Sequence, residues 1–516
     1  MSDAHAPGLP PLKGMALAVT AIALALGTFM QVLDLSIANV AIPTIAGNLS
    51  VSPDQGTWVI TSFAVANGVS VPMTGWLMTR YGVVRTFVAS VILFTLASFL
   101  CGISWNLASL LAFRVLQGAV SGPMIPGSQS LMIMIFPPRQ RGTALAIWSM
   151  TTLVAPVAGP VIGGFISDNL PWPWLFLINL PVGVICAFLC WRGMAGRETP
   201  TRKAPIDTVG FMLLATWVGA FQVMVDTGKD ADWFNSPAIV VEALIAVIGL
   251  IAWVIWELNE ENPIVDLTIL RSRNFAIGSA VFCLSYAVFF GTNLLQPLWL
   301  QTHMGYIATW AGLVAAPSGV VAIFLTPFTA RLMNRIDARW AATASLSIMA
   351  ISFYMRSGFT PDVDVFHLVL PMLVQGTAMS FFMVSMITLS LKGIEPARIP
   401  AASGISNFVR ITGGSFAASI TTTVWDRWEA VHQTRLAETM TSNKASWSAA
   451  VAGLQHAGMS LPQAISAIGR QVVDQAYLLS TLDFFRVSAW LMIMLVPLIW
   501  LTARSMGAGA TIAAAD

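Results

Sequence analysis

The chain has 516 residues, of which 56% are hydrophobic and only 10% are charged, and its mean hydropathy is +0.75. An ordinary soluble domain is about 25% charged, so this chain has too few ionisable groups to cover a water-exposed surface, and a water-soluble globular protein is excluded. Most of its exterior must face lipid. The formal net charge is only +2, and no basic run is interleaved with aromatic residues, which excludes a nucleic-acid-binding surface.

Fourteen apolar runs of membrane-spanning length follow one another, separated by short segments rich in Gly, Pro and charged residues. Each helical crossing needs about 20 mostly apolar residues. The runs are 15–46, 54–77, 86–104, 107–136, 143–166, 172–193, 208–227, 237–256, 275–298, 310–330, 340–358, 366–391, 403–426 and 477–503. We therefore predict an all-α polytopic membrane protein with fourteen spans. The first run lacks a nearby cleavage site of small residues, which favours a permanent span over a cleaved signal peptide.

The positive charges predict the orientation of the chain. If the N-terminus lies inside, seventeen Lys and Arg residues fall in inner connections, six in outer connections and three within the spans. Because cytoplasmic loops carry the excess of Lys and Arg, both termini are expected to be cytoplasmic. An odd number of spans would destroy this asymmetry, so the distribution also favours an even number.

Two long inner connections, 193–207 and 257–274, divide the spans into blocks of six, two and six. We expect a cytoplasmic tail over 1–14, an N-terminal six-helix bundle over 15–193, a linker over 194–274 with an inserted transmembrane hairpin at about 208–256, a C-terminal six-helix bundle over 275–504 and a cytoplasmic tail over 505–516. Similar basic segments at 75–85 and 329–339 are consistent with repeated halves, the plan of many transporters, although the positive-inside rule alone would also produce them. A polar outer segment at about 427–476 is long enough to dock another protein, but it equally fits a solvated loop with a helical turn or two.

Two ionisable side chains lie deep in the predicted spans of the first bundle. Asp34 is in the first span with Gln31 one turn before it, and Arg114 is in the fourth span with Gln117 one turn after it. An ionisable residue within a span costs about 2.5–3.5 kcal/mol on insertion, so it normally faces protein or water and marks a pathway. Burial favours a protonated carboxylate and a nearby arginine favours an ionised one, so Asp34 and Arg114 are predicted to couple proton movement to conformational change. The alternative is a structural ion pair, whose net stabilisation is often small.

A third embedded charge is Arg410 in the thirteenth span, which follows Asn407 by one turn. We predict that these two residues, together with Gln31 and Gln117, line a substrate cavity and offer hydrogen bonds within an otherwise apolar wall. Arg410 also lies about two turns from the cytoplasmic end of its span, so it could instead extend its head group to the membrane interface.

The fifth span contains a strip of small residues at Gly159, Pro160, Gly163 and Gly164. Such a strip permits close approach of a second helix, and the proline removes one backbone donor and bends its own helix. This composition suits a moving interface, although static packing of small residues is the alternative.

Catalytic motifs are absent from the sequence: it contains neither a zinc-protease motif nor a phosphate-binding loop. An enzyme is therefore not expected, and a proton gradient is a simpler energy source than ATP. The four cysteines lie in apolar runs without a neighbouring His or carboxylate, so neither a metal site nor a cofactor is expected.

Several of these segments resemble the major facilitator superfamily, and more closely its fourteen-span drug:proton antiporters of the EmrB type. The matching segments are LDLSIANVAIPTIA (33–46), GWLMTRYGVVR (75–85), RVLQG (114–118), GPVIGG (159–164) and WPWLFLINLPVG (172–183). Thr79 departs from the pattern, because the family has an aspartate at this position of the loop between spans two and three.

The resemblance implies a major facilitator fold and multidrug efflux: export of hydrophobic drugs or toxic compounds across the bacterial inner membrane in exchange for protons. It implies two protein partners, a periplasmic adaptor of the EmrA type and an outer-membrane channel of the TolC type, with segment 427–476 as the contact for the adaptor. It also implies gating roles for Gly75, Arg80, Gly82 and Arg85. Two alternatives remain open: a proton-linked uptake symporter of the same fold, and a non-transporting polytopic protein whose embedded charges are structural.

Overall fold

A computed structural model of the chain describes residues 11–51, 53–137, 140–203, 205–228, 231–333, 335–395, 398–439 and 445–503. Within these ranges the regular structure is entirely helical. The predicted tail over 505–516, most of the tail over 1–14 and the charged residues Arg139, Lys229 and Lys444 lie outside the described residues.

Helices occupy every predicted span. In the first half they are α1 (Gly14–Asn48), α2 (Pro53–Ser70), α3 (Thr74–Tyr81), α4 (Val83–Gly102), α5 (Leu107–Ser121), α6 (Met124–Ile135), α7 (Arg141–Asn169), α8 (Trp174–Leu177) and α9 (Asn179–Gly193). Next come α10 (Thr208–Thr227), a 3-10 turn η2 (Trp233–Asn235), α11 (Pro237–Asn259) and η3 (Leu267–Arg271). The second half contains α12 (Arg273–Thr302), α13 (Ala308–Met333), α14 (Ala338–Arg356), α15 (Val365–Leu391), α16 (Ile399–Thr439), α17 (Ala445–His456) and α18 (Leu461–Trp500).

Ten of the described helical segments are long and apolar enough to cross a membrane, which confirms an all-α polytopic protein. The other four predicted spans coincide with α2–α3, α7, α14 and α16, which are helical but fall outside that group. Three predicted spans are each divided in two: α2 and α3 are separated at Pro72, α5 and α6 at Gly122 and Pro123, and α8 and α9 at Ile178. Proline has no N–H to donate to the preceding turn, so the first two interruptions lie where the helical hydrogen-bond ladder loses a donor.

Side chains cap several of these helices at the ends of the bundle. Asn106 accepts a hydrogen bond from the backbone N–H of Ser109 and begins α5 with a capping box. Asp207, Asp337 and Asp364 accept from backbone N–H groups in the first turns of α10, α14 and α15. These caps satisfy donors that a helix leaves unpaired at its N-terminus.

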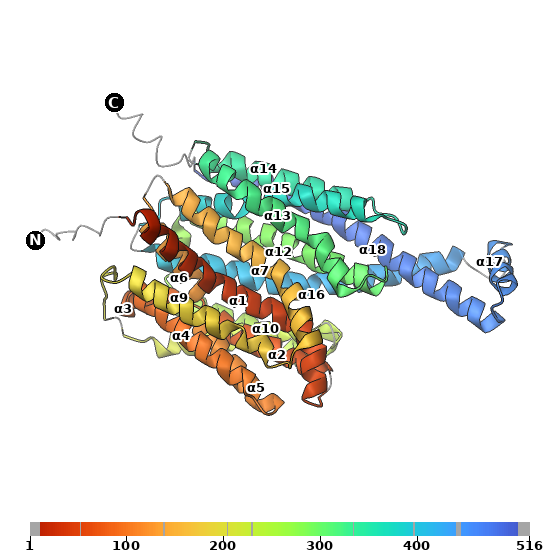
Figure 1. Ribbon diagram of the computed structural model, residues 1–516, viewed down its shortest axis with the longest axis horizontal. Coiled ribbons are helices and arrows are strands. Elements are labelled where there is room, and N and C mark those ends of the chain that lie inside the picture. Colours follow the sequence, from red (N-terminus) through yellow and green to blue (C-terminus); the bar gives the residue numbers. More distant parts are fainter. Residues whose placement is uncertain are drawn as a thin grey trace, which may run out of the picture.

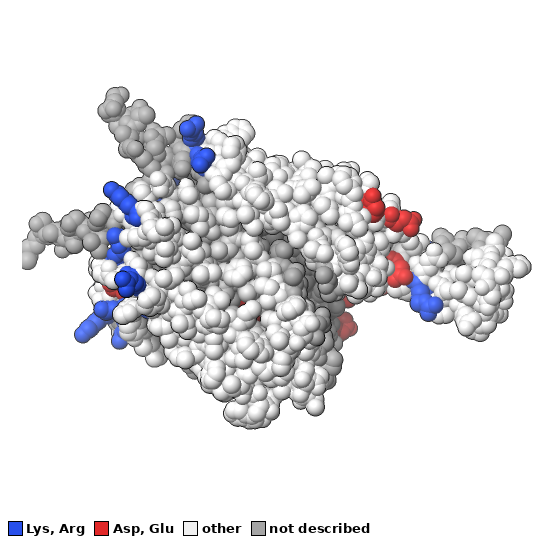
Figure 2. All heavy atoms as spheres, in the orientation of Figure 1, with Lys and Arg blue, Asp and Glu red and all other residues white. Residues whose placement is uncertain are grey.

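The long helices lie side by side in one bundle, and α18 ends at the same end of the bundle at which α1 begins (Figure 1). Figure 2 shows Lys and Arg side chains gathered at that end and Asp and Glu side chains toward the opposite end. We call these the basic end and the outer end. The basic segments 75–85 and 329–339 both join consecutive helices, as the sequence predicted for short connections.

Most of the helix packing lies within one or the other half of the chain. In the first half α1 packs on α7 and α9, and α5 packs on α2 and α4; in the second half α15 packs on α13 and α14, and α16 on α12 and α18. The hairpin α10–α11 packs through α10 on α2 and α16. Contacts between the halves join α7 to α13 and α15, and join α3 and α6 to α16.

At the basic end the two halves are in close contact between α3 and α16. A Cβ atom on Gly75 of α3 would lie 2.7 Å from Cβ and 2.9 Å from Cα of Ala401 in α16. A larger residue at position 75 would clash with Ala401, so a glycine is required for this approach of α3 to α16.

The outer segment differs from a loop. Helix α16 continues to Thr439, α17 follows, and α18 begins at Leu461, so the described part of 427–476 is mainly helical. Figure 1 shows these helices extending well beyond the rest of the bundle. Val451 of α17 packs against Ala464 and Ile468 of α18 in a small apolar cluster of their own.

Candidate functional site

The acid and the arginine of the first bundle form a direct, sealed ion pair. Asp34 Oδ2 lies 2.6 Å from Arg114 Nη1, and both side chains have no exposed surface. Asp34 comes from the middle of α1 and Arg114 from the middle of α5. The structure thus brings together the two residues predicted for proton coupling, although they are distant in sequence.

Two amides and a hydroxyl complete what we call the Asp34 cluster: Asp34, Arg114, Gln117, Asn179 and Ser98. Asp34 Oδ1 accepts from Gln117 Nε2 at 3.2 Å and from Asn179 Nδ2 at 2.7 Å. The same two amide groups donate to Ser98 Oγ at 3.1 and 2.9 Å. The three hydrogen bonds from Arg114, Gln117 and Asn179 are all donated to the carboxylate, which suits an ionised carboxylate because that form only accepts.

Arg114 is fixed from several sides. Its Nε donates to the carbonyl oxygen of Val59 at 3.0 Å, and its Nη1 also donates to Gln117 Oε1 at 2.8 Å. The guanidinium carbon lies 4.4 Å from the ring centre of Phe63 and 5.5 Å from that of Phe176. Such cation–π contacts are worth about 2 kcal/mol or more when desolvated. The nitrogen Nη2 has no hydrogen-bond partner among the described residues, so the pair keeps one spare donor.

Glycine allows α5 to come close enough to α2 for this arrangement. A Cβ atom on Gly118 would lie 2.4 Å from the carbonyl oxygen of Phe63 and 2.9 Å from Cβ of Ala66. The RVLQG motif therefore supplies a cation, an amide and a close helix contact within five residues.

Asn179 and Ser98 were not among the residues predicted for this site. Both are small neutral polar residues in apolar spans, a common composition with little predictive value. Asn179 did offer one signal, because it is the sole amide side chain between Trp172 and Arg192.

Gln31 lies one turn from Asp34 but does not join its cluster. The side chain is 1% exposed, and neither its Nε2 nor its Oε1 has a hydrogen-bond partner among the described residues. A buried amide without partners is costly, so Gln31 has hydrogen-bonding capacity available for a ligand or water.

The predicted cavity residues on α16 form a separate group that connects the halves. Asn407 Nδ2 donates to Gln129 Oε1 of α6 at 2.9 Å, and Arg410 Nη2 donates to Asn407 Oδ1 at 3.0 Å. Arg410 is 4% exposed, and its guanidinium carbon lies 4.6 Å from the ring centre of Tyr286. Its head group therefore stays among protein side chains in this structure and does not extend to the membrane interface. Gln117, in the Asp34 cluster, is not part of this group.

The loop motif at the basic end is held by a carboxylate from the linker. Gly82 has φ +93° at the junction of α3 and α4, a conformation that favours glycine. Glu198 accepts from the backbone N–H groups of Val84 and Arg85 at 3.0 and 2.9 Å, and its carboxylate lies 3.9 Å from Arg85 Nε. The α3–α4 turn is thus tied to segment 194–207.

Thr79, which departs from the family pattern, forms a hydrogen bond within its own helix. Its hydroxyl donates to the carbonyl oxygen of Gly75 within α3, at 2.8 Å. The guanidinium of Arg80 lies over the rings of Trp76 and Tyr81, at 5.4 and 5.7 Å from their centres. Thr79 cannot make the charged interaction that an aspartate would offer.

The glycines of the fifth span differ in their surroundings. A Cβ atom on Gly159 would lie 2.1 Å from Ser36 Oγ of α1, and one on Gly163 would lie 3.3 Å from Cα of Ile37. Gly164 has nothing within 4 Å of that position. The strip therefore packs on α1 through Gly159 and Gly163 but not through Gly164; the side chain of Pro160 lies outside the described part of the structure.

A second fully buried arginine was missed by the sequence analysis. Arg356, at the outer end of α14, is 0% exposed and contacts Ser352 Oγ at 3.4 Å and Met372 Sδ at 3.7 Å. Its Nε and Nη1 have no hydrogen-bond partner among the described residues. The sequence places it at the edge of a span, where an arginine normally reaches water, so no signal distinguished it.

The guanidinium carbon of Arg356 lies 5.2 and 5.5 Å from the ring centres of Phe353 and Phe485. We expect Arg356→Met to stabilise the protein by about 1 kcal/mol, because a methionine can still pack on both rings and removes a buried charge that has no acidic partner among the described residues. The matched variant Arg114→Met should do the opposite and cost about 3–5 kcal/mol, because it leaves Asp34 buried without its partner. Thermal unfolding of both purified variants measures the two effects. Destabilisation by Arg356→Met would show that this guanidinium has a stabilising partner.

A comparison with family models matches the Major Facilitator Superfamily over residues 24–418. Among curated proteins, the chain is 45% identical over 500 residues to the multidrug export protein EmrB of Escherichia coli K12, covering 97% of this chain and 98% of that protein. It is 44% identical over 492 residues to the fatty acid resistance protein FarB of Neisseria gonorrhoeae, covering 95% and 97% of the two chains.

Among solved structures, the proton:xylose symporter XylE aligns with a TM-score of 0.63 at 11% identity, over 95% of this chain and 97% of that one. The human organic anion transporter MFSD10 aligns with a TM-score of 0.58 at 12% identity, over 94% and 100%. At such low identity these two structures show the shared fold alone.

Proposed function

Because this chain belongs to the major facilitator superfamily and, within it, to the group of EmrB and FarB, we propose that it exports hydrophobic drugs in exchange for protons. It is a multi-pass membrane transporter rather than an enzyme. The observation that carries the proton-coupling part is the sealed Asp34–Arg114 pair at 2.6 Å. Burying an ion pair of this kind is costly unless its geometry is unusually good, and ionisable residues within membrane spans mostly mark functional sites.

Protonation of Asp34 supplies a coupling mechanism. The neutral acid is a poorer partner for Arg114, and a buried charge without its partner costs about 3–5 kcal/mol. Protonation therefore disfavours the sealed arrangement and favours a conformation in which α1 and α5 shift and Arg114 finds other acceptors. Loss of the proton restores the pair, so one proton per cycle can drive movement of the two helices.

The basic end of the bundle supports an orientation with both termini in the cytoplasm (Figure 2). In the resulting cycle, Asp34 takes up a proton from the periplasmic side as drug is released, and it loses the proton to the cytoplasm. Drug moves outward while protons move inward. We place the protein in the bacterial inner membrane.

The contacts between the halves support two six-helix bundles, 15–193 and 275–504, that rock against each other, with the α10–α11 hairpin between them in sequence. Asn407, Gln129 and Arg410 lie at the contact of α6 with α16. Rocking would separate Asn407 from Gln129 and free both amides for a substrate. Gln31 would add a further donor and acceptor from α1.

The outer extension supports a protein partner. Helices α16 and α18 continue past the membrane-spanning part and carry α17 at their tip (Figure 1). We propose that this extension contacts a periplasmic adaptor of the EmrA type, which joins the pump to an outer-membrane channel of the TolC type.

Transport in inverted membrane vesicles tests the proposal. With the cytoplasmic face outward and the lumen acidified, a panel of fluorescent hydrophobic dyes should accumulate inside, and an uncoupler should abolish the accumulation. Vesicles without the protein are the control. Proton-driven loss of dye from the lumen would favour the symporter alternative, and no effect of the protein on any dye would favour a non-transporting protein.

A further inference from the structure

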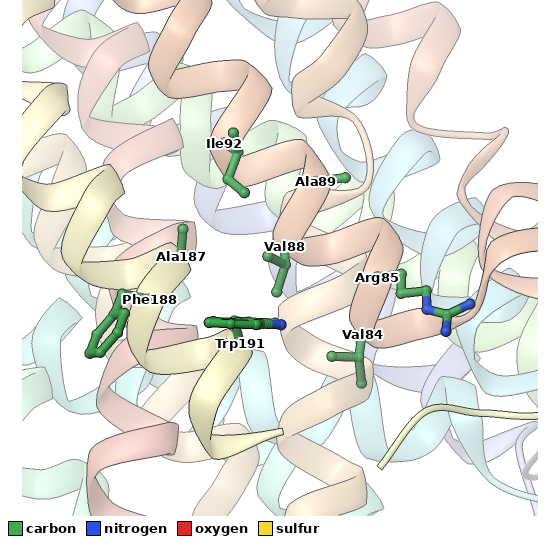
Figure 3. Close-up of a pocket in the computed structure, with 8 residues that line it drawn as sticks. All are labelled: Val84, Arg85, Val88, Ala89, Ile92, Ala187, Phe188 and Trp191. Atoms are coloured by element: carbon green, nitrogen blue, oxygen red, sulfur yellow. The ribbon is translucent and has the colours of Figure 1, made fainter. Parts of the chain in front are cut away.

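Two apolar grooves open on the lipid-facing side of the bundle near its basic end. The first lies between α4 and α9 and has a volume of about 390 Å³. Figure 3 shows Val88, Ile92, Phe188 and Trp191 along it, while the guanidinium of Arg85 points away from the groove. Glu198 already lies beside that guanidinium, so the described residues that line this groove include no unpaired cation.

The second groove is larger and has an aromatic floor. Its volume is about 510 Å³, and it lies between the α10–α11 hairpin, η3 and α16. The rings of Trp217 and Trp253 are 5.6 Å apart, and that of Phe408 lies 5.8 Å from Trp217. Val254 and Leu250 of α11 complete the wall. This surface fits an acyl chain in shape and polarity.

The floor also carries an unused hydrogen-bond donor. Trp217 is 7% exposed, and its Nε1 has no partner among the described residues. Trp253, by contrast, donates from its Nε1 to Glu257 Oε1 at 3.0 Å. The Trp217 N–H itself has almost no accessible surface, so a ligand in the groove meets the apolar part of the floor.

A cation stands at the basic-end margin of the same groove. Arg271 ends η3 and lines the groove, and Arg273 begins α12 two residues later; both are exposed. Neither has an acidic partner within the described ranges, whereas the neighbouring Arg398 is paired with Asp266. An apolar wall and a free cation at its margin together match an amphiphile with an anionic head group.

We propose that this groove binds one anionic phospholipid, with an acyl chain on the Trp217–Trp253–Phe408 floor and the phosphate at Arg271. The lipid fills the junction between the inserted hairpin and the second bundle and thereby stabilises the hairpin on α16. The proposal rests on the assigned orientation of the basic end toward the cytoplasmic leaflet, but not on drug transport.

The test uses the full-length protein in nanodiscs of phosphatidylcholine with or without phosphatidylglycerol. Native mass spectrometry measures the retained lipid, and thermal unfolding measures stabilisation. The wild-type protein should retain phosphatidylglycerol in preference to phosphatidylcholine and unfold at a higher temperature with it. Arg271→Gln should weaken that preference about fivefold, which corresponds to the about 1 kcal/mol expected of one cation near a lipid head group.

Two further variants keep the test specific. Arg192→Gln removes an exposed arginine at the same end but outside the groove, and it should retain the full preference. Val254→Trp fills the groove and should lower phosphatidylglycerol retention with Arg271 intact. Equal preference in Arg271→Gln and wild type, or equal loss in Arg192→Gln, would overturn the proposal. So would displacement of the lipid by a transported dye, because the groove would then belong to the transport pathway; loss of transport alone would leave it intact.

Discussion

Asp34→Asn is expected to abolish pH-driven dye accumulation in inverted vesicles, reducing it to the level of vesicles without a gradient. Asparagine keeps the size of the side chain and can still accept from Asn179 or Gln117, but it cannot bind and release a proton. The substitution also leaves Arg114 buried without its counter-charge, at a cost of about 3–5 kcal/mol. Dye uptake must therefore be normalised to the amount of folded protein in the vesicles.

A charge-balanced variant separates coupling from stability. Asp34→Asn combined with Arg114→Gln removes both charges, so we expect a smaller loss of stability but the same loss of proton-driven uptake. Glu242→Gln is the matched control, because it neutralises a carboxyl on α11 outside the Asp34 cluster and should leave coupling unchanged. Retention of gradient-driven uptake by the double variant would make the Asp34–Arg114 pair structural.

Both members of the pair could be identified from the sequence, because a charged side chain is rarely tolerated within a membrane span. Few ionisable residues lie deep within a span, so Asp34 and Arg114 stand out against their apolar surroundings. Their mutual contact was an interpretation of the sequence, as a coupling pair or a structural ion pair, because nothing in α1 or α5 encodes which neighbouring helix each side chain will face. The structure adds that fact, and it places Gln117 in the same cluster.

The neutral polar partners of Asp34 could not be predicted by this criterion. Ser98 and Asn179 hold Asp34 and Gln117 in position, but hydroxyls and amides are tolerated in many spans. The role of Glu198 could not be predicted either, because acidic residues are common in polar linkers. Only the folded structure shows that it lies at the N-terminus of α4.

The helix boundaries were also only partly predictable from the sequence. Apolar runs predicted the membrane-spanning part of each helix, because burial in lipid requires them. They could not predict that α16 and α18 extend beyond the bundle, since those extensions are polar and are stabilised outside the membrane by contacts such as that of Val451 with Ile468. The helix breaks at Pro72 and Pro123 were not predicted, because both prolines lie within apolar runs that were each interpreted as one continuous span.

Gly159→Ala and Gly164→Ala are expected to change stability in opposite directions, although the two glycines lie in the same six-residue motif. At Gly159 the new methyl group would lie 2.1 Å from Oγ and 2.4 Å from Cβ of Ser36, so α1 and α7 must separate, at a cost of about 1–3 kcal/mol. At Gly164 the methyl group meets nothing within 4 Å, and replacing a helical glycine with alanine contributes about 0.5–1 kcal/mol of stability. Thermal unfolding of the purified variants measures both.

A second substitution tests whether the clash between the new methyl group at position 159 and Ser36 would cause the loss of stability. Ser36→Gly in the Gly159→Ala background removes the two nearest atoms and should recover most of the stability. Because Ser36 lies two residues after Asp34, separation of α1 from α7 should also disturb the Asp34–Arg114 pair, so Gly159→Ala should lose proton-driven uptake beyond its loss of folded protein. If uptake per folded molecule stays at the wild-type level, the strip acts only in static packing; if uptake falls and Ser36→Gly restores it, the α1–α7 contact positions the proton-coupling acid.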